Sequence, residues 1–141
     1  MIEIETTATV ARPQPVMLSL VIPMYNEEEN LQGTIERVGA TLARFKDGPW
    51  EVIIVNDGST DRTWEVARAL AMDEAYPWLR VKGYSQNRGR GYALRTGFAA
   101  ARGEWIVAID ADLSYDPIYI LDLVRVLRER EDVDIVLASA Y

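Results

Sequence analysis

The 141-residue chain is long enough for one domain of ordinary size and too short for two. Its content of 49% hydrophobic and 26% charged residues is typical of a folded globular protein and excludes a disordered or collagen-like chain. The net charge of −7 argues against general binding of nucleic acid. The sequence has no Cys and no His, which excludes disulfides, thiolate nucleophiles and imidazole bases. Any metal must therefore bind to oxygen ligands, which favour Mg²⁺, Mn²⁺ or Ca²⁺.

Residues 1–16 are expected to form a flexible N-terminal arm. They are polar, contain Pro13 and Pro15, and lack the apolar run of a secretory signal. Residues 17–141 are expected to form the single folded domain. No segment approaches the roughly 20 uninterrupted apolar residues of a membrane-spanning helix. We therefore expect a chain without a membrane span, most simply located in the cytoplasm.

From Met17 onward, short apolar runs alternate with segments long enough for helices. The predicted strands are residues 18–23, 51–55, 79–83, 105–110 and 134–138, and the predicted helices are residues 28–45, 60–75, 91–101 and 117–130. Asp116 before Pro117 is typical of a helix start, and Ser59 or Thr60 is expected to cap the second helix. The alternation predicts an α/β fold: a doubly wound, mostly parallel sheet with helices on both faces.

The ligand crevice of such a sheet lies outside the carboxyl ends of its strands. We predict the strand order 3-2-1-4, with the fifth strand beyond the fourth. Polar residues follow the first four predicted strands, in the segments Tyr25-Asn26-Glu27, Asn56-Asp57-Gly58-Ser59-Thr60-Asp61, Asn87-Arg88-Gly89-Arg90-Gly91 and Asp110-Ala111-Asp112. Asp57 and Asp112 are therefore expected to face one crevice.

Asp110 and Asp112 end the fourth predicted strand, where alternate carboxylates can share a divalent ion that also binds a diphosphate. The alternative is a turn that leads into the next helix, although Asp116 already supplies a cap for that helix. Asp57 either accepts hydrogen bonds from a sugar hydroxyl or base, or forms an ordinary Asx turn.

The remaining polar segments have similar alternatives. Arg88 and Arg90 offer guanidinium groups to an anion, or belong to a solvated loop. Tyr25 and Glu27 lie near the predicted crevice and could hold a nucleotide base.

Four segments, found together in this order, carry a resemblance to a known family. They are LSLVIPMYNEEENL, EVIIVNDGSTDRT, NRGRGYALRTGFAAARGEW and IDADLSYDP. The chain resembles glycosyltransferase family 2, which has the GT-A nucleotide-sugar-binding fold, and within it the dolichyl- or polyprenyl-phosphate sugar synthases. The resemblance covers residues 18–141.

The resemblance implies a nucleotide pocket lined by Pro23, Tyr25, Glu27, Val55 and Asp57. It also implies a DxD-type motif at Asp110, Ala111 and Asp112. In that motif the two aspartates bind Mg²⁺ or Mn²⁺ together with the diphosphate of the donor. The function implied is metal-dependent, inverting transfer of a sugar from a UDP- or GDP-sugar, with a polyprenyl or dolichyl phosphate as the acceptor.

Two departures from the family pattern affect this interpretation. Many relatives have arginine where this chain has Ala140, so the diphosphate is expected to depend more on the metal and on Arg88 and Arg90. The chain also stops where complete members continue into their acceptor-binding part, so we expect only the donor-binding part, and no catalytic base is assigned.

Two alternatives to a glycosyltransferase stay open. One is a non-catalytic nucleotide-sugar-binding module or an inactive fragment. The other is a phosphatase of the haloacid dehalogenase type, since Asp110-Ala111-Asp112 is similar to its nucleophile strand. That family requires a lysine downstream of this strand, whereas Lys46 and Lys82 both lie upstream.

Overall fold

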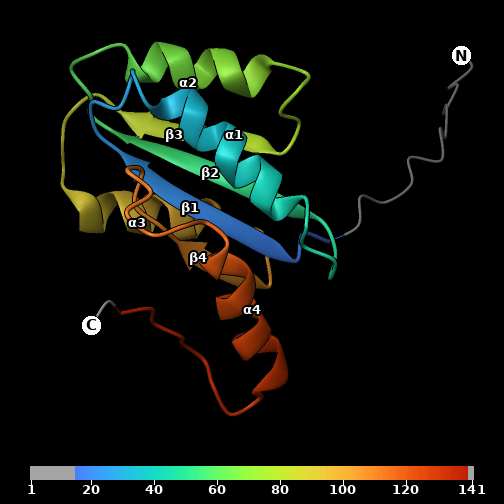
Figure 1. Cartoon of the computed structure of the whole chain (residues 1–141). Helices are drawn as coiled ribbons and strands as arrows, with labels where there is room; N and C mark the ends of the chain where they lie inside the picture. The colour runs from blue at the N-terminus through green and yellow to red at the C-terminus, as the bar shows by residue number, and fades with distance from the viewer. Residues whose placement is uncertain (1–14, 140–141) are drawn as a thin grey trace, which may run out of the picture.

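The computed structural model describes residues 15–139, so residues 1–14 of the predicted arm lie outside the described part of the chain. Strands and helices alternate along the described residues (Figure 1). They are β1 (Leu18–Met24), α1 (Leu31–Leu42), β2 (Trp50–Asp57), α2 (Thr63–Met72), β3 (Leu79–Tyr84), α3 (Arg90–Ala100), β4 (Trp105–Ala108) and α4 (Tyr119–Glu129). None of the helices within residues 15–139 has the length and apolar character needed to cross a membrane.

The strands form one sheet in the order β3-β2-β1-β4, and every neighbouring pair is parallel. The register places Ile22 of β1 opposite Ile54 of β2 and Val21 of β1 opposite Ala108 of β4. The predicted order of the first four strands is confirmed. All four carboxyl ends consequently lie at the same edge of the sheet.

Helices cover both faces of the sheet, as predicted (Figure 1). Leu20 and Ile22 of β1 pack in the larger core cluster with Ile35 of α1, whereas Val21 packs on the opposite face with Ala93 of α3. This split arises because successive side chains of a strand point to opposite faces. The close approach of α3 depends on Gly97, where an added Cβ would lie 2.2 Å from Cγ1 of Val21.

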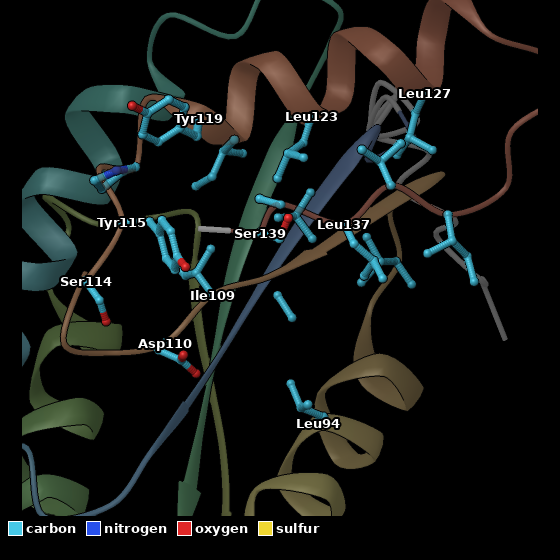
Figure 2. Close-up of a pocket in the computed structure, with 18 of the residues that line it drawn as sticks. Leu94, Ile109, Asp110, Ser114, Tyr115, Tyr119, Leu123, Leu127, Leu137 and Ser139 are labelled. Carbon is cyan, nitrogen blue, oxygen red and sulfur yellow. The ribbon is translucent and has the colours of Figure 1, made fainter. Parts of the chain in front are cut away.

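The prediction of a fifth strand at residues 134–138 is wrong: this segment forms no strand. Ile135 and Leu137 are 76% and 86% exposed. Within the described residues β4 pairs only with β1, and its other edge is separated from the C-terminal segment by a trough of about 810 Å³. Leu123 and Leu127 of α4 and Leu94 of α3 line this trough (Figure 2). An apolar run can favour an extended backbone, but only a hydrogen-bonded neighbour makes it a strand.

The predicted cap of the second helix is also wrong. α2 begins at Thr63, whose backbone N–H donates to Oδ1 of Asp61 at 2.9 Å. The hydroxyl of Ser59 instead accepts a hydrogen bond from the backbone of Asn26, in another loop. At α4 the predicted cap is closer to the structure, since Asp116 accepts a hydrogen bond from the N–H of Ile118, directly before the helix.

A buried carboxylate that the sequence analysis did not single out lies at the amino end of β2. Glu51 is 2% exposed and accepts hydrogen bonds from the hydroxyl of Ser19 at 2.7 Å, from Arg80 at 2.8 Å and from Nη2 of Arg102 at 2.7 Å. Burial raises the pKa of Glu51, but the hydrogen bonds from Arg102, Ser19 and Arg80 outweigh it and lower the pKa to about 2. This ion cluster lies near the amino ends of the strands, at the opposite end of the sheet from the polar segments that follow the strands.

Candidate functional site

The loop after β1 is tied to the loop after β2 through Asn26. The side-chain oxygen of Asn26 accepts hydrogen bonds from the backbone N–H groups of Thr60 at 2.8 Å and Asp61 at 3.3 Å. The next residue, Glu27, donates its backbone N–H to the hydroxyl of Thr63 at 2.8 Å. Asn26 has φ +52°, a conformation that Asn tolerates better than most residues. This role of Asn26 was not predicted from the sequence, where the available signal was an Asn two residues after the end of β1.

Asp57, the last residue of β2, anchors the turn that precedes α3. Its Oδ1 accepts hydrogen bonds from the hydroxyl of Tyr84 at 2.7 Å and the backbone N–H of Arg88 at 2.8 Å. Its Oδ2 accepts one from the side-chain amide of Asn87 at 3.2 Å. Asp57 is 5% exposed, and burial together with the bond to Asp57 raises the pKa of Tyr84. The predicted Asx turn belongs to Asn56, whose side chain accepts the N–H of Ser59.

Gly58 brings the loop after β2 into direct contact with this turn. It has φ +64°, and an added Cβ would lie 2.1 Å from the backbone nitrogen of Asn87. A side chain at this position would thus be strained in the backbone and would also collide with main-chain atoms. The guanidinium of Arg88 lies over the ring of Tyr92, 5.0 Å from its centroid. These contacts hold the backbone of the turn against the end of β2.

Arg90, the first residue of α3, links the same turn to the end of β4. Its Nε and Nη2 both lie 3.0 Å from Oδ1 of Asp110. The side chains of Arg90 and Asp110 are 59% and 54% exposed, so solvent screens the pair. The turn between β3 and α3 therefore contacts Asp57 at one side and Asp110 at the other.

Asp110 and Asp112 lie in a tight turn after β4. The N–H of Leu113 donates to the carbonyl of Asp110 at 3.2 Å, and Leu113 has φ +50°, which is unusual for a bulky side chain. Asp112 accepts hydrogen bonds from the hydroxyl and the N–H of Ser114, which lower the pKa of Asp112. The carbonyl of Ala111 accepts a bond from the hydroxyl of Thr34 in α1 at 3.1 Å.

Two carboxylates, Asp110 and Asp112, are available to the metal predicted from the sequence. The described residues hold no group of three or more Asp or Glu side chains that could bind a metal by themselves. Both Asp110 and Asp112 are exposed, and their side-chain partners are surface groups that can exchange with solvent. Mg²⁺ and Mn²⁺ sites commonly use one or two carboxylates and complete their shell with phosphate oxygens and water. The donor set present fits such an ion bound together with a diphosphate.

The other predicted pocket residues differ in how much of their side chain is accessible. Tyr25 is 46% exposed, and Glu27 and Pro23 are partly exposed. Val55 is completely buried in the core between the sheet and α3, so its side chain lines no surface. Only the backbone of Val55 could contact a ligand.

Two hollows adjoin the turn after β4. Asp110 lies at one end of the apolar trough between α3 and α4 (Figure 2). A smaller hollow of about 280 Å³ lies between α1 and Asp112, where Glu29, Thr34 and Arg37 form part of its lining. The turn that carries the two aspartates thus separates the trough from the surface of α1.

The model of the family "Glycosyl transferase family 2" matches residues 19–141. The chain belongs to this family. Dodecaprenyl-phosphate galacturonate synthase of Rhizobium johnstonii is 39% identical over 118 residues, which are 84% of this chain and 34% of that protein. The chain spans about a third of the length of the curated relatives it matches.

Solved structures agree with this assignment. Glucosyl-3-phosphoglycerate synthase from Mycobacterium tuberculosis, in complex with Mn²⁺, UDP and glucosyl-3-phosphoglycerate, matches with a TM-score of 0.61 and 30% identity, over 82% of this chain and 41% of that one. A mannosyltransferase from Pyrobaculum calidifontis, in complex with GDP-Man and Mn²⁺, matches with a TM-score of 0.58 and 27% identity, over 72% and 30%. The expected family and α/β fold are confirmed. None of these three proteins is a phosphatase, and that alternative is dropped.

Proposed function

We propose that this chain binds a UDP- or GDP-sugar together with Mg²⁺ or Mn²⁺, as the donor-binding part of an inverting glycosyltransferase. The observation that carries the proposal is the turn at residues 85–90. Its backbone is bonded to Asp57 at the end of β2, and its Arg90 is paired with Asp110 at the end of β4. One short segment thereby joins Asp57, at the proposed nucleoside site, to Asp110, one of the two aspartates proposed to hold the metal.

Each predicted residue has a role in the proposed complex. Tyr25 and Glu27 flank the base, while Pro23 and the backbone of Val55 form the floor beneath it. Asp57 orients the nucleoside side of the turn, and Arg88 and Arg90 contact the diphosphate, which suits the forked geometry of guanidinium groups. Asp110 and Asp112 hold the metal, with the backbone of Ala111 between them. Bound there, the metal ion offsets negative charge on the departing nucleoside diphosphate.

The proposed acceptor is a polyprenyl or dolichyl phosphate. A phosphate oxygen of the acceptor attacks the anomeric carbon of the sugar, the bond from that carbon to the diphosphate oxygen breaks, and the nucleoside diphosphate leaves with the electron pair. The anomeric centre is inverted in this single displacement. An ionised phosphate needs no general base before it attacks, which agrees with a site built without histidine.

A polyprenyl-phosphate acceptor is also supported by the name of the galacturonate synthase relative. A location in the cytoplasm, where such an acceptor would be met at the membrane face, is part of the same proposal. The division of the chain into an arm at residues 1–16 and a nucleotide-sugar-binding domain at residues 17–141 belongs to it as well.

The test of the proposal is calorimetric titration of UDP and GDP with and without Mn²⁺. We expect Mn²⁺ to strengthen the binding of one of the two nucleotides. Asp112→Asn should remove most of that gain, because the amide keeps the size of the side chain but loses its charge. Asp122→Asn is the matched control, since it makes the same charge change on the exposed surface of α4. Equal gains from Mn²⁺ in the wild type and Asp112→Asn would contradict the proposal.

Transfer itself separates an enzyme from a binding module. The measurement is sugar transfer to a polyprenyl phosphate by this chain, at protein concentrations that reveal a single turnover. Positioning of the acceptor near the anomeric carbon can account for about 7–11 kcal/mol of the barrier. We expect the chain alone to bind donor with little or no transfer. Multiple turnover would show that this chain holds the acceptor as well.

A further inference from the structure

Arg90 and Asp110 form an ion pair, yet the proposed function assigns them different ligands: the diphosphate to Arg90 and the metal to Asp110. Both Nε and Nη2 of Arg90 lie 3.0 Å from the same oxygen, Oδ1 of Asp110. That oxygen therefore already accepts one charge-assisted hydrogen bond, from Nε, and has a second guanidinium nitrogen at ion-pair distance. A divalent cation that binds to Oδ1 must displace the guanidinium of Arg90, because two cations at contact distance from one carboxylate oxygen repel each other strongly.

The two arginines of the turn are held in different ways. Arg88 is fixed by its backbone bond to Asp57 and lies over the ring of Tyr92. The side chain of Arg90 has one hydrogen-bond partner within residues 15–139, which is Asp110. Arg90 is the first residue of α3, and its side chain is more than half exposed. Arg90 can therefore change partners at low cost without movement of the helix.

We infer that Arg90 and the divalent cation compete for Asp110, and that Arg90 leaves Asp110 for the donor diphosphate when the cation binds. This inference rests on the proposed function, in which Asp110 and Asp112 are the metal ligands. Arg90 then has two positions: on Asp110 in the free chain and on the diphosphate in the complex. It is a positioning residue that couples the binding of the cation to the binding of the nucleotide.

The competition predicts effects of opposite sign on the two ligands. Removal of the guanidinium frees Asp110, so the cation alone should bind more tightly. The nucleotide in the presence of the cation should bind more weakly, because its diphosphate loses a partner. Coupling between two sites is reciprocal, so the same change should reduce the factor by which cation and nucleotide strengthen each other. If Arg90 only bound the diphosphate, its removal would weaken nucleotide binding but would not alter the coupling between cation and nucleotide.

The experiment measures Mn²⁺ alone by electron paramagnetic resonance of the free ion, and UDP and GDP by calorimetry at zero and saturating Mn²⁺. For Arg90→Gln we expect Mn²⁺ to bind about two- to fivefold more tightly, the range that an exposed ion pair accounts for. Arg95→Gln is the matched control, because it removes the same charge from an exposed position on the same helix. It should change Mn²⁺ affinity less than twofold, roughly the scale of a remote screened charge.

A second comparison isolates the pair from general electrostatics. In an Asp110→Asn background, Arg90→Gln should have no effect on Mn²⁺ affinity, because the contested oxygen no longer carries charge. A tighter Mn²⁺ complex in Arg90→Gln, absent from Arg95→Gln and from the Asp110→Asn background, supports the competition. Equal effects of Arg90→Gln and Arg95→Gln would overturn it, and metal-dependent nucleotide binding by the wild type would still stand. Failure of the wild type to bind Mn²⁺, alone or with nucleotide, would overturn the metal site and the competition together.

Discussion

Glu51 and Asp57 are two buried carboxylates on the same strand, and they have opposite surroundings. Both belong to β2, and their side chains share a face of the sheet because their positions differ by an even number of residues. They are 2% and 5% exposed. Glu51 is paired with the guanidinium groups of Arg80 and Arg102, whereas Asp57 accepts hydrogen bonds from neutral groups of Tyr84, Asn87 and Arg88.

The difference separates a carboxylate that stabilises the fold from one that shapes the candidate site. The charge of Glu51 is compensated by two cations at the edge of the sheet away from the polar strand ends. The hydrogen bonds to Asp57 fix its geometry at the end of the sheet where a ligand would bind, and within residues 15–139 Asp57 forms no ion pair. We therefore expect changes at Glu51 to affect stability and changes around Asp57 to affect the turn at residues 85–90.

The largest effect is expected from Glu51→Gln, which should lower the free energy of unfolding by about 3 kcal/mol, since it leaves two guanidinium groups without their buried partner. The measurement is urea denaturation followed by circular dichroism. Glu104→Gln is the control, because it makes the same charge change at an exposed position two residues after Arg102. It should alter stability by less than about 0.5 kcal/mol. Similar decreases in unfolding free energy in the two variants would show that Glu51 stabilises the fold no more than a surface charge does.

The same cluster predicts how stability depends on pH. The pKa of Glu51 is about 2 in the folded chain, below its usual 4.5, so folding favours the ionised form. Ionised Glu51 therefore contributes about 3 kcal/mol to the free energy of unfolding above pH 4.5, and this contribution is lost as the pH falls toward 2. Urea denaturation at pH 5 and at pH 2.5 should therefore show the gap between wild type and Glu51→Gln shrinking to below about 1 kcal/mol. A difference in unfolding free energy that does not change with pH would show that the ionised form of Glu51 is not what stabilises the fold.

At the other end of β2, Gly58→Ala should lower the free energy of unfolding by about 2 kcal/mol, from backbone strain and contact with the main chain of Asn87. Urea denaturation measures the loss, and the amide resonances of Gln86 and Asn87 report displacement of the turn. Gly33→Ala is the control, because in α1 the added Cβ would have no atom within 4 Å apart from its chain neighbours and the backbone of its own helix. It should be neutral or stabilise by about 0.5–1 kcal/mol. Unchanged resonances of the turn in Gly58→Ala would show that this contact does not position it.

The smallest effect is expected from Tyr84→Phe, which removes one of the hydrogen bonds to Asp57. The loss in unfolding free energy should be about 1 kcal/mol, since Arg88 and Asn87 still donate to the carboxylate. Tyr92→Phe serves as the control because it keeps the ring against Tyr84 and Arg88. If Tyr84→Phe matches Tyr92→Phe in both stability and UDP or GDP affinity, the hydroxyl of Tyr84 has no part in holding Asp57.

The sequence by itself determined the alternation of elements and the edge of the sheet where polar residues gather. Apolar runs such as residues 18–23 and 51–55 have no polar alternation, so they belong inside a sheet covered on both faces. Parallel connections then place the ends of β2 and β4 at one edge, which brings Asp57 and the pair Asp110 and Asp112 to the same side. That much depends on local pattern and chain topology alone.

Only the tertiary structure decided which groups these residues contact. The run at residues 134–138 is as apolar as the true strands, yet it has no hydrogen-bonded neighbour beside β4 and forms no strand. Asp57 meets Tyr84 and Asn87 from about 30 residues away, and Glu51 meets Arg102 from 51 residues away. Such partners are set by the spacing of strands and helices in three dimensions, and a local sequence pattern contains no information about them.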